Sequence, residues 1–138
     1  MAELIRVDHK DGDRFEIDIR QHVVSVDQPV GNGGEDTAPT PTELFMGSLA
    51  ACVAFYSRRF LARHDLPTDG LSVTAEFAMG VRPARVSEVG LQIRVPDGVS
   101  DEKRAALLAV ASHCTVHNSL EQPPEVTIEL AVPAPSSS

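Results

Sequence analysis

Apolar and charged residues alternate along the first part of the chain. The clearest case is Phe15 to Ile19, where every second residue is apolar and the residues between are acidic. This pattern is typical of a strand with one buried face. A comparable segment, Leu4 to His9, is separated from it by the turn residues 10–13, and a third, His22 to Val26, follows. The pattern predicts a β-hairpin extended by a third strand.

Helical spacing replaces this alternation after a loop. Residues 27–39 are rich in glycine and proline, so we expect no regular element there. A helix is predicted to begin at Thr40, which can cap it, because Pro41 suits the first helical position and Glu43 completes a capping box. We place the end of this helix near Asp65. Its apolar residues recur at helical spacing and are Leu44, Phe45, Leu49, Cys52, Val53, Tyr56, Phe60 and Leu61.

Two helical segments are predicted in the second half of the chain. The first runs from Asp101 to about His113, with Ser100 as its cap and acidic residues in its first turn. A further helical turn is expected within Cys114 to Glu121. The residues predicted to face inward from the first segment are Ala105, Leu108, Val110 and Ala111.

The remaining apolar segments read as strands. Leu71 to Met79 and Arg85 to Val95 predict a second hairpin, and Val126 to Leu130 alternates like a last strand. This order of elements indicates an α+β fold with mainly antiparallel pairing. A chain of 138 residues suits one domain, which we assign to residues 1–132, with 133–138 as a disordered tail.

Charge and hydropathy exclude several classes of function. The net charge of -8 leaves no diffuse positive field to hold a phosphate backbone, so nucleic-acid binding is not expected. The longest apolar segment without a charge, Leu44 to Ser57, is short of the roughly 20 residues that cross a bilayer. No leader sequence is evident at the N-terminus. We therefore expect a cytoplasmic protein with no membrane partner.

Two cysteines are the candidate chemical groups. Free cysteine is often a small buried hydrophobe, and the spacing of Cys52 and Cys114 alone favours that interpretation. A redox role would need both sulfurs to meet. The amide groups of a helical turn that begins at Cys114 would then lower the pKa of its thiol. Cys52 is in mid-helix, so an arginine from the N-terminal strands would have to lower the pKa of its thiol instead.

Metal binding is the weaker alternative for these residues. His113 and His117 flank Cys114, and with Cys52 they offer nitrogen and sulfur ligands. The spacing is short and there is no second cysteine pair, so we predict no metal and no cofactor. Sequence motifs of serine hydrolases and phosphate-binding loops are absent.

Three stretches carry a resemblance to a known family. They are Gly33 to Pro39, Pro41 to Cys52 with the sequence PTELFMGSLAAC, and Cys114 to Leu120 with the sequence CTVHNSL. These resemble the signature stretches of the OsmC/Ohr family, the osmotically inducible protein C and organic hydroperoxide resistance proteins. The similarity extends from the first strands to Leu130.

The resemblance implies a thiol-dependent peroxidase with an OsmC-like fold, in which antiparallel sheets surround a long central helix of an intertwined homodimer. It implies that Cys52 attacks an organic hydroperoxide, or hydrogen peroxide, and becomes a sulfenic acid. Cys114 then forms a disulfide with it, and a dithiol reductant restores both thiols. Apolar residues near Cys52, including Phe45, Leu49 and Phe55, favour apolar peroxides.

The chain departs from the hydroperoxide-resistance branch at the start of its long helix. In that branch a glutamate directly follows the proline and orients an arginine over the thiolate, whereas here Thr42 follows Pro41 and the glutamate is Glu43. We interpret Glu43 first as a capping residue and second as a catalytic one, because a straight helix places it about 180° from Cys52.

Two more departures concern the arginine and the second cysteine. The nearest match to the activating arginine is Arg14, with Arg6 and Arg20 as rivals, and Thr115 stands where relatives usually carry proline. His22 followed by Asp27 is a further feature, and we interpret this pair as a structural hydrogen bond. Together these features resemble the broad OsmC-like branch. The alternative function is therefore a non-catalytic small-molecule binder or a thiol redox sensor.

Overall fold

The computed structural model describes residues 3–131, so the tail predicted at 133–138 lies outside the described residues. The elements in chain order are β1 (Arg6–Asp11), β2 (Arg14–Ile19), β3 (His22–Val26), the 3-10 helix η1 (Val30–Asn32), α1 (Pro41–Arg63), β4 (Ser72–Gly80), β5 (Arg85–Arg94), α2 (Asp101–Ala111) and α3 (Thr115–Glu121). The predicted α+β class with antiparallel pairing is confirmed.

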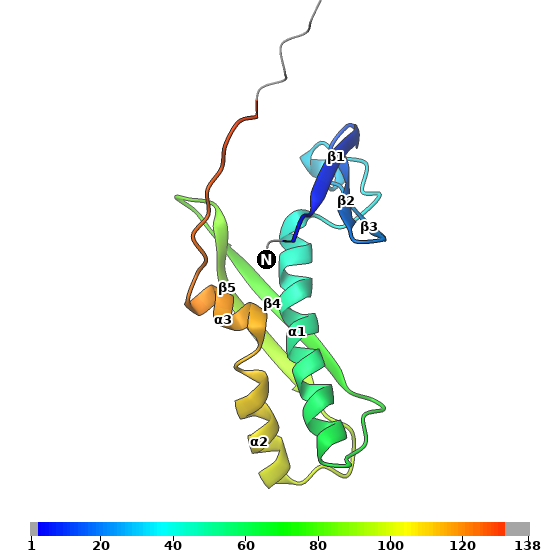
Figure 1. Ribbon diagram of the computed structural model, residues 1–138, viewed down its shortest axis with the longest axis vertical. Helices are drawn as coiled ribbons and strands as arrows, with labels where there is room; N and C mark the ends of the chain where they lie inside the picture. The colour runs from blue at the N-terminus through cyan, green and yellow to red at the C-terminus, as the bar shows by residue number, and fades with distance from the viewer. Residues whose placement is uncertain (1–2, 132–138) are drawn as a thin grey trace, which may run out of the picture.

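The first three strands form a sheet of their own. They pair in the order β1-β2-β3, both pairs antiparallel, which places Val7, Ile17 and Val24 side by side. Opposite residues share a face, so one face of this sheet is apolar. The sheet lies beyond the N-terminal end of α1 and contacts the rest of the described chain only slightly (Figure 1). As a result Val7, on the apolar face, stays 54% exposed.

The loop before α1 is more ordered than the sequence predicted. Our expectation of no regular element in 27–39 is wrong for Val30–Asn32, which form the short helix η1. A buried carboxylate explains this order: Asp27 accepts hydrogen bonds from the backbone N–H and the hydroxyl of Thr37, at 3.0 and 2.6 Å. The loop is thereby closed across ten residues.

Helix α1 begins as predicted. The Thr40 hydroxyl accepts from the Glu43 N–H at 3.0 Å, and the Glu43 carboxylate accepts from the Thr40 N–H at 2.9 Å, so the capping box is confirmed. The helix ends at Arg63, two residues early, because Asp65 adopts a left-handed φ of 55°. No helix within residues 3–131 is long and apolar enough to span a membrane.

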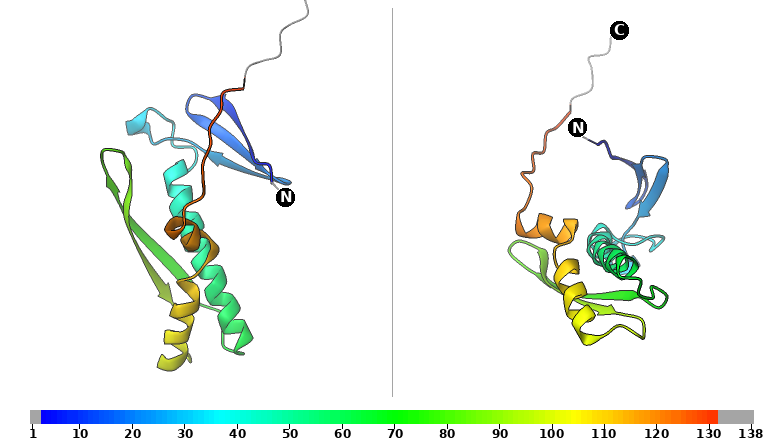
Figure 2. Two further views of the ribbon diagram at one scale, coloured as in Figure 1. Left: turned by 60° about the vertical axis from the view of Figure 1, so that its left-hand side comes forward. Right: turned by 60° about the horizontal axis from the view of Figure 1, so that its bottom comes forward.

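One core holds the rest of the molecule together. The β4–β5 hairpin packs along one side of α1, and α2 and α3 pack along another (Figure 2). The four largest side chains that are completely buried are Leu61, Leu107, Cys114 and Ser57. All four come from the helices or, for Cys114, from the cap of α3, and partly buried strand residues pack against them, so the core forms where the helices meet the hairpin.

The second helix buries a different face from the one predicted. Ser100 caps α2 as expected, accepting from the Lys103 N–H at 3.3 Å. The buried residues are Leu107 and Ala111, whereas Leu108 is 58% exposed. Ala105 and Val110, also predicted inside, are exposed too. Because several apolar residues follow one another in α2, its sequence is compatible with burial of either of two adjacent faces. Packing against α1 buries the face that carries Leu107.

The predicted last strand is absent from the described chain. Residues 126–130 run as an extended chain away from α3, and within residues 3–131 they have no hydrogen-bonded strand partner (Figure 1). The apolar residues Val126, Ile128 and Leu130 are 72%, 91% and 93% exposed. Alternation records a tendency to form a strand, but a strand needs a partner to satisfy its backbone groups.

Candidate functional site

The two cysteines meet although 61 residues lie between them in the sequence. Cys52 lies on α1 and is half-buried, and its side chain packs against the core that contains Cys114. The two side chains lie within hydrogen-bonding reach of each other. Neither cysteine is in a disulfide. The arrangement therefore holds two reduced thiols in one place.

Cys114 occupies the N-cap position of α3. Its sulfur accepts the backbone N–H of His117, with Sγ and N 3.4 Å apart. This confirms the helical turn that the sequence predicted after Cys114. The side chain is completely buried, at 0% exposure, so a reagent from solvent reaches Cys52 first.

Burial raises the pKa of the Cys114 thiol, and the hydrogen bond and charge of Cys52 raise it further. The amide groups of His117 and Val116 act in the opposite direction and lower the pKa less than burial raises it. Cys114 is therefore kept as a protonated thiol at neutral pH. A protonated thiol next to a more accessible cysteine suits a proton-donating second reactant better than a first nucleophile.

A hydrogen bond next to the cysteines was missed by the sequence analysis. The hydroxyl of Tyr56, one turn after Cys52, lies 2.8 Å from the hydroxyl of Thr115, which directly follows Cys114. Tyr56 was recognised only as an apolar residue on the stripe of Cys52. The signal available was its lone phenol, since a tyrosine at a helix interface usually finds a polar partner.

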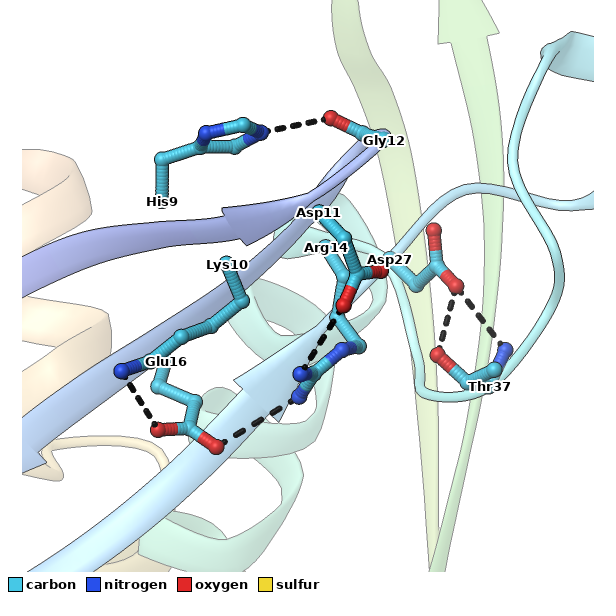
Figure 3. A network of polar contacts seen from close by, with 8 residues as sticks. All are labelled: His9, Lys10, Asp11, Gly12, Arg14, Glu16, Asp27 and Thr37. Atoms are coloured by element: carbon cyan, nitrogen blue, oxygen red, sulfur yellow. Dashed lines mark hydrogen bonds and ion pairs between the residues drawn. The ribbon is translucent and has the colours of Figure 1, made fainter.

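Arg14 lies elsewhere in this chain. Its guanidinium contacts Asp11 and Glu16 at 3.2 and 3.4 Å, and Glu16 also pairs with Lys10 (Figure 3). The hydrogen bond that Arg14 donates to Asp11 raises the pKa of Arg14, so this guanidinium stays charged. All of these partners belong to the sheet β1–β3. No hydrogen bond within residues 3–131 joins Arg14 to Cys52.

The rival arginines are no closer candidates. Arg6 is exposed and pairs with Asp8 at 3.1 Å, and Arg20 sits in the β2–β3 turn with a φ of 54°. Glu43 is engaged with the backbone of Thr40, in the cap described above. The structure of a single chain thus brings Cys52 and Cys114 together and leaves Arg14 and Glu43 apart from them.

The histidines are engaged in hydrogen bonds of their own. His113 Nδ1 lies 3.1 Å from the Ala109 carbonyl oxygen, and His117 contacts Ser112 through Nδ1 and Glu121 through Nε2. Within residues 3–131 no three His, Cys, Asp or Glu side chains converge as a metal site would require. The partners of Asp27 are Thr37 and Gln28 and not His22, which corrects the expected pairing of His22 and Asp27.

Known structures share this architecture. A protein of Psychrobacter arcticus described as an osmotic stress induced and detoxification response protein is 26% identical, with a TM-score of 0.78, over 83% of this chain and 85% of that one. An OsmC-like protein of Mycoplasma pneumoniae is 15% identical, with a TM-score of 0.76, over 89% of each chain. An organic hydroperoxide resistance protein of Elizabethkingia anophelis is 22% identical, with a TM-score of 0.67, over 89% and 91%.

Sequence comparison agrees with the fold. No curated protein matches the chain. The family model described as OsmC-like protein matches residues 33–129, which include both cysteines, all of α1 and the β4–β5 hairpin. Because this match spans most of the chain, the protein belongs to the OsmC-like family.

Proposed function

We propose that this protein is a thiol-dependent peroxidase that reduces organic hydroperoxides, and also hydrogen peroxide, by a two-cysteine cycle. The observation that carries the proposal is the meeting of Cys52 and Cys114 in the reduced state. One thiol is accessible and the other is buried and protonated. Two thiols that differ in this way suit a reaction in which one attacks and the other resolves.

In the first step the Cys52 thiolate attacks one oxygen of the hydroperoxide. A sulfur–oxygen bond forms and the O–O bond breaks, so the thiolate is oxidised to a sulfenic acid while the peroxide is reduced. The other oxygen leaves with its organic group and takes up a proton to become an alcohol. With hydrogen peroxide the same step releases water.

In the second step the Cys114 sulfur attacks the sulfur of the Cys52 sulfenic acid. The disulfide forms, the sulfur–oxygen bond breaks, and the hydroxide leaves with the Cys114 proton as water. The raised pKa of Cys114 keeps that proton on its thiol until this step. A dithiol reductant then reduces the disulfide and is itself oxidised to a disulfide. A cycle that depends on such a reductant suits the cytoplasm.

A homodimer would supply a positive charge to Cys52, to which Arg14 makes no hydrogen bond within residues 3–131. The sheet β1–β3 stands off from the body with an open apolar face, and the segment 126–130 is extended and pairs with no strand in the described part of the chain. Both features suit an intertwined assembly around the long helix α1, in which segments of one protomer pack on the other. We assign the activating guanidinium to Arg14 of the second copy.

In this scheme Glu43 serves first as the cap of α1, and contact with the activating arginine is a secondary role on which the reaction does not depend. Its carboxylate is used in the capping box, but this cap is at the exposed start of α1. A capping carboxylate can also face an arginine of another protomer, because only one of its oxygens is needed for the cap. Phe45 and Phe55, at 40% and 50% exposure on the same helix, favour apolar peroxides.

The test is consumption of cumene hydroperoxide with dithiothreitol as the reductant. Cys52→Ser should abolish it, whereas Cys114→Ser should allow a first turnover and then leave Cys52 as sulfinic or sulfonic acid, detected by mass spectrometry. Ser48→Ala, an exposed change on the same helix, is the matched control. Unchanged rates in both cysteine variants would refute the cycle.

The second candidate is a small-molecule binder or redox sensor, favoured by the absence of a contact between Arg14 and Cys52 within residues 3–131. Thiol titration after one equivalent of peroxide separates the two. A peroxidase loses both thiols within seconds, whereas a non-enzymatic binder or sensor loses them slowly or not at all.

A further inference from the structure

A cavity of about 370 Å³ lies at the C-terminal half of α1, where this helix faces α2. Its apolar wall consists of Phe55, Tyr56, Phe60 and Val110, and its polar wall consists of Arg59, Arg63 and His64. None of the described residues that line it is acidic. We propose that this cavity binds an aromatic carboxylate, whose ring packs on the apolar wall and whose anionic group is bound by the polar wall.

The first cationic group is held in place by an aromatic ring. The guanidinium carbon of Arg59 lies 4.5 Å from the ring centroid of Phe55. Stacking uses the face of the guanidinium and leaves its N–H groups, which lie in the plane, free to donate. Neither Arg59 nor Arg63 makes an ion pair within residues 3–131. Two arginines are therefore available to a carboxylate.

His64 adds a donor with a defined tautomer. Its ring packs on Phe60, with the centroids 4.3 Å apart, and its Nδ1 lies 3.4 Å from the Lys103 ammonium nitrogen. An ammonium group only donates, so Nδ1 accepts and the proton of the neutral ring is on Nε2. The Nε2–H is the donor left for a ligand, and Lys103 adds a positive charge behind it.

The helix dipole explains only part of this cluster. Positive side chains near the last turn of a helix are favourable, which accounts for Arg63 and His64. It does not account for the aromatic wall or for the stacking of Arg59. Arg59 and Arg63 are also four residues apart, a spacing at which like charges repel. An anion between them relieves this repulsion.

The size and composition of the cavity select the kind of anion. Its volume lies within the range of small-molecule sites, and its walls combine an apolar surface with a few convergent polar groups. In a chain of net charge -8, this local positive field is needed for an organic anion to bind at all. A single carboxylate matches the planar fork of an arginine.

The experiment is a titration of the full-length protein with 1-naphthoate, followed by calorimetry and by NMR, with 1-naphthalenemethanol as the neutral analogue. We expect naphthoate to bind at least about tenfold more tightly than the alcohol, and Arg59→Gln and Arg63→Gln each to weaken naphthoate about tenfold. The matched control is Arg58→Gln, an exposed arginine of the same helix that does not line the cavity. It should leave the affinity unchanged.

Three results would overturn the proposal. The first is equal affinity for naphthoate and for the alcohol, and the second is an equal loss of naphthoate affinity in Arg58→Gln and Arg59→Gln. The third is no binding up to about 10 mM naphthoate. A partner subunit that covers the cavity would give this third result. Because the cavity does not use the thiols, Cys52→Ser should bind naphthoate like the wild type. Loss of peroxidase activity and loss of naphthoate binding are thus separate outcomes.

Discussion

Tyr56 and Thr115 are 59 positions apart in the sequence and share a hydrogen bond of 2.8 Å between their hydroxyl groups. Tyr56 lies one helical turn after Cys52, and Thr115 is bonded directly to Cys114. The contact therefore ties the helix of one cysteine to the cap of the other. It is the only such side-chain hydrogen bond between α1 and α3 within the described residues 3–131.

The first prediction concerns Thr115→Val, which removes the hydroxyl and keeps the shape. We expect the Cys52–Cys114 disulfide to become less stable towards dithiothreitol by about threefold to tenfold, because the two thiols are held together less firmly. That change corresponds to about 15–30 mV in reduction potential. The measurement is a redox titration with thiol alkylation, which does not depend on peroxidase activity.

Thr115→Ser is the control, since it keeps a hydroxyl and should restore most of the wild-type potential. A global loss of stability alone, about 0.5–1.5 kcal/mol for one hydrogen bond, would lower the urea midpoint without moving the potential. That outcome would show that the contact supports the fold but does not position the thiols.

The second prediction separates the two roles of Glu43. Glu43→Gln keeps an oxygen that can accept the Thr40 N–H, so we expect unchanged stability and a peroxidase rate within about twofold of wild type. Thr40→Ala removes the hydroxyl that accepts the Glu43 N–H and should cost about 1 kcal/mol in urea unfolding. A tenfold slower Glu43→Gln with unchanged stability would instead assign the carboxylate to the reaction.

These helix features show what could be predicted from local sequence. The cap at Thr40, the helix that starts at Pro41 and the helical turn after Cys114 all depend on neighbouring residues, so their patterns predicted them correctly. The meeting of the two cysteines was expected from the resemblance and not from spacing. The bond between Tyr56 and Thr115 depends on how distant elements pack, which single-sequence patterns do not encode.

The third prediction concerns acid stability. Hydrogen bonds from Thr37 and from the Gln28 N–H lower the pKa of Asp27 below its ordinary value. A lowered native pKa contributes stability above the unfolded-state value, about pH 4, and this contribution is lost as the pH falls through the native pKa. We therefore expect the urea midpoints of wild type and Asp27→Asn to differ at pH 6 and to converge below about pH 4.

Asp69→Asn, a change at an exposed loop residue, is the control for this experiment and should follow the wild-type curve throughout. A difference between wild type and Asp27→Asn that stays constant from pH 6 to pH 3 would contradict the prediction, because it would mean that the carboxylate charge plays no part.

The fourth prediction tests the same loop by packing. A Cβ added at Gly34 would overlap the carbonyl of Gln28 and come within 2.8 Å of Asp27 Oδ1, whereas one added at Gly31 would meet nothing within 4 Å. Gly34→Ala should therefore destabilise the protein by about 1–3 kcal/mol, and Gly31→Ala by no more than about 0.5 kcal/mol. Equal effects in thermal or urea unfolding would contradict this account of the loop.

At residues 126–130 the prediction from the sequence differs from the structure of the single chain. Their alternation predicted a strand, yet they pair with no strand in the described chain. The sequence records the side chains that a strand would bury, but the hydrogen-bonding partner belongs to tertiary or quaternary structure. The same holds for the exposed Val7 on the sheet β1–β3.

The fifth prediction is that this extended segment is buried in a homodimer. Ile128 is 91% exposed in the single chain, and burying one isoleucine contributes roughly 1.5–3 kcal/mol, twice in a symmetric pair. Ile128→Asp should therefore raise the dimer dissociation constant by at least about a hundredfold in sedimentation equilibrium. Thr127→Asp, which points to the other side of the segment, should change it far less. A wild-type chain that sediments as a monomer at micromolar concentration would refute the dimer, and with it the assignment of Arg14 to the second copy.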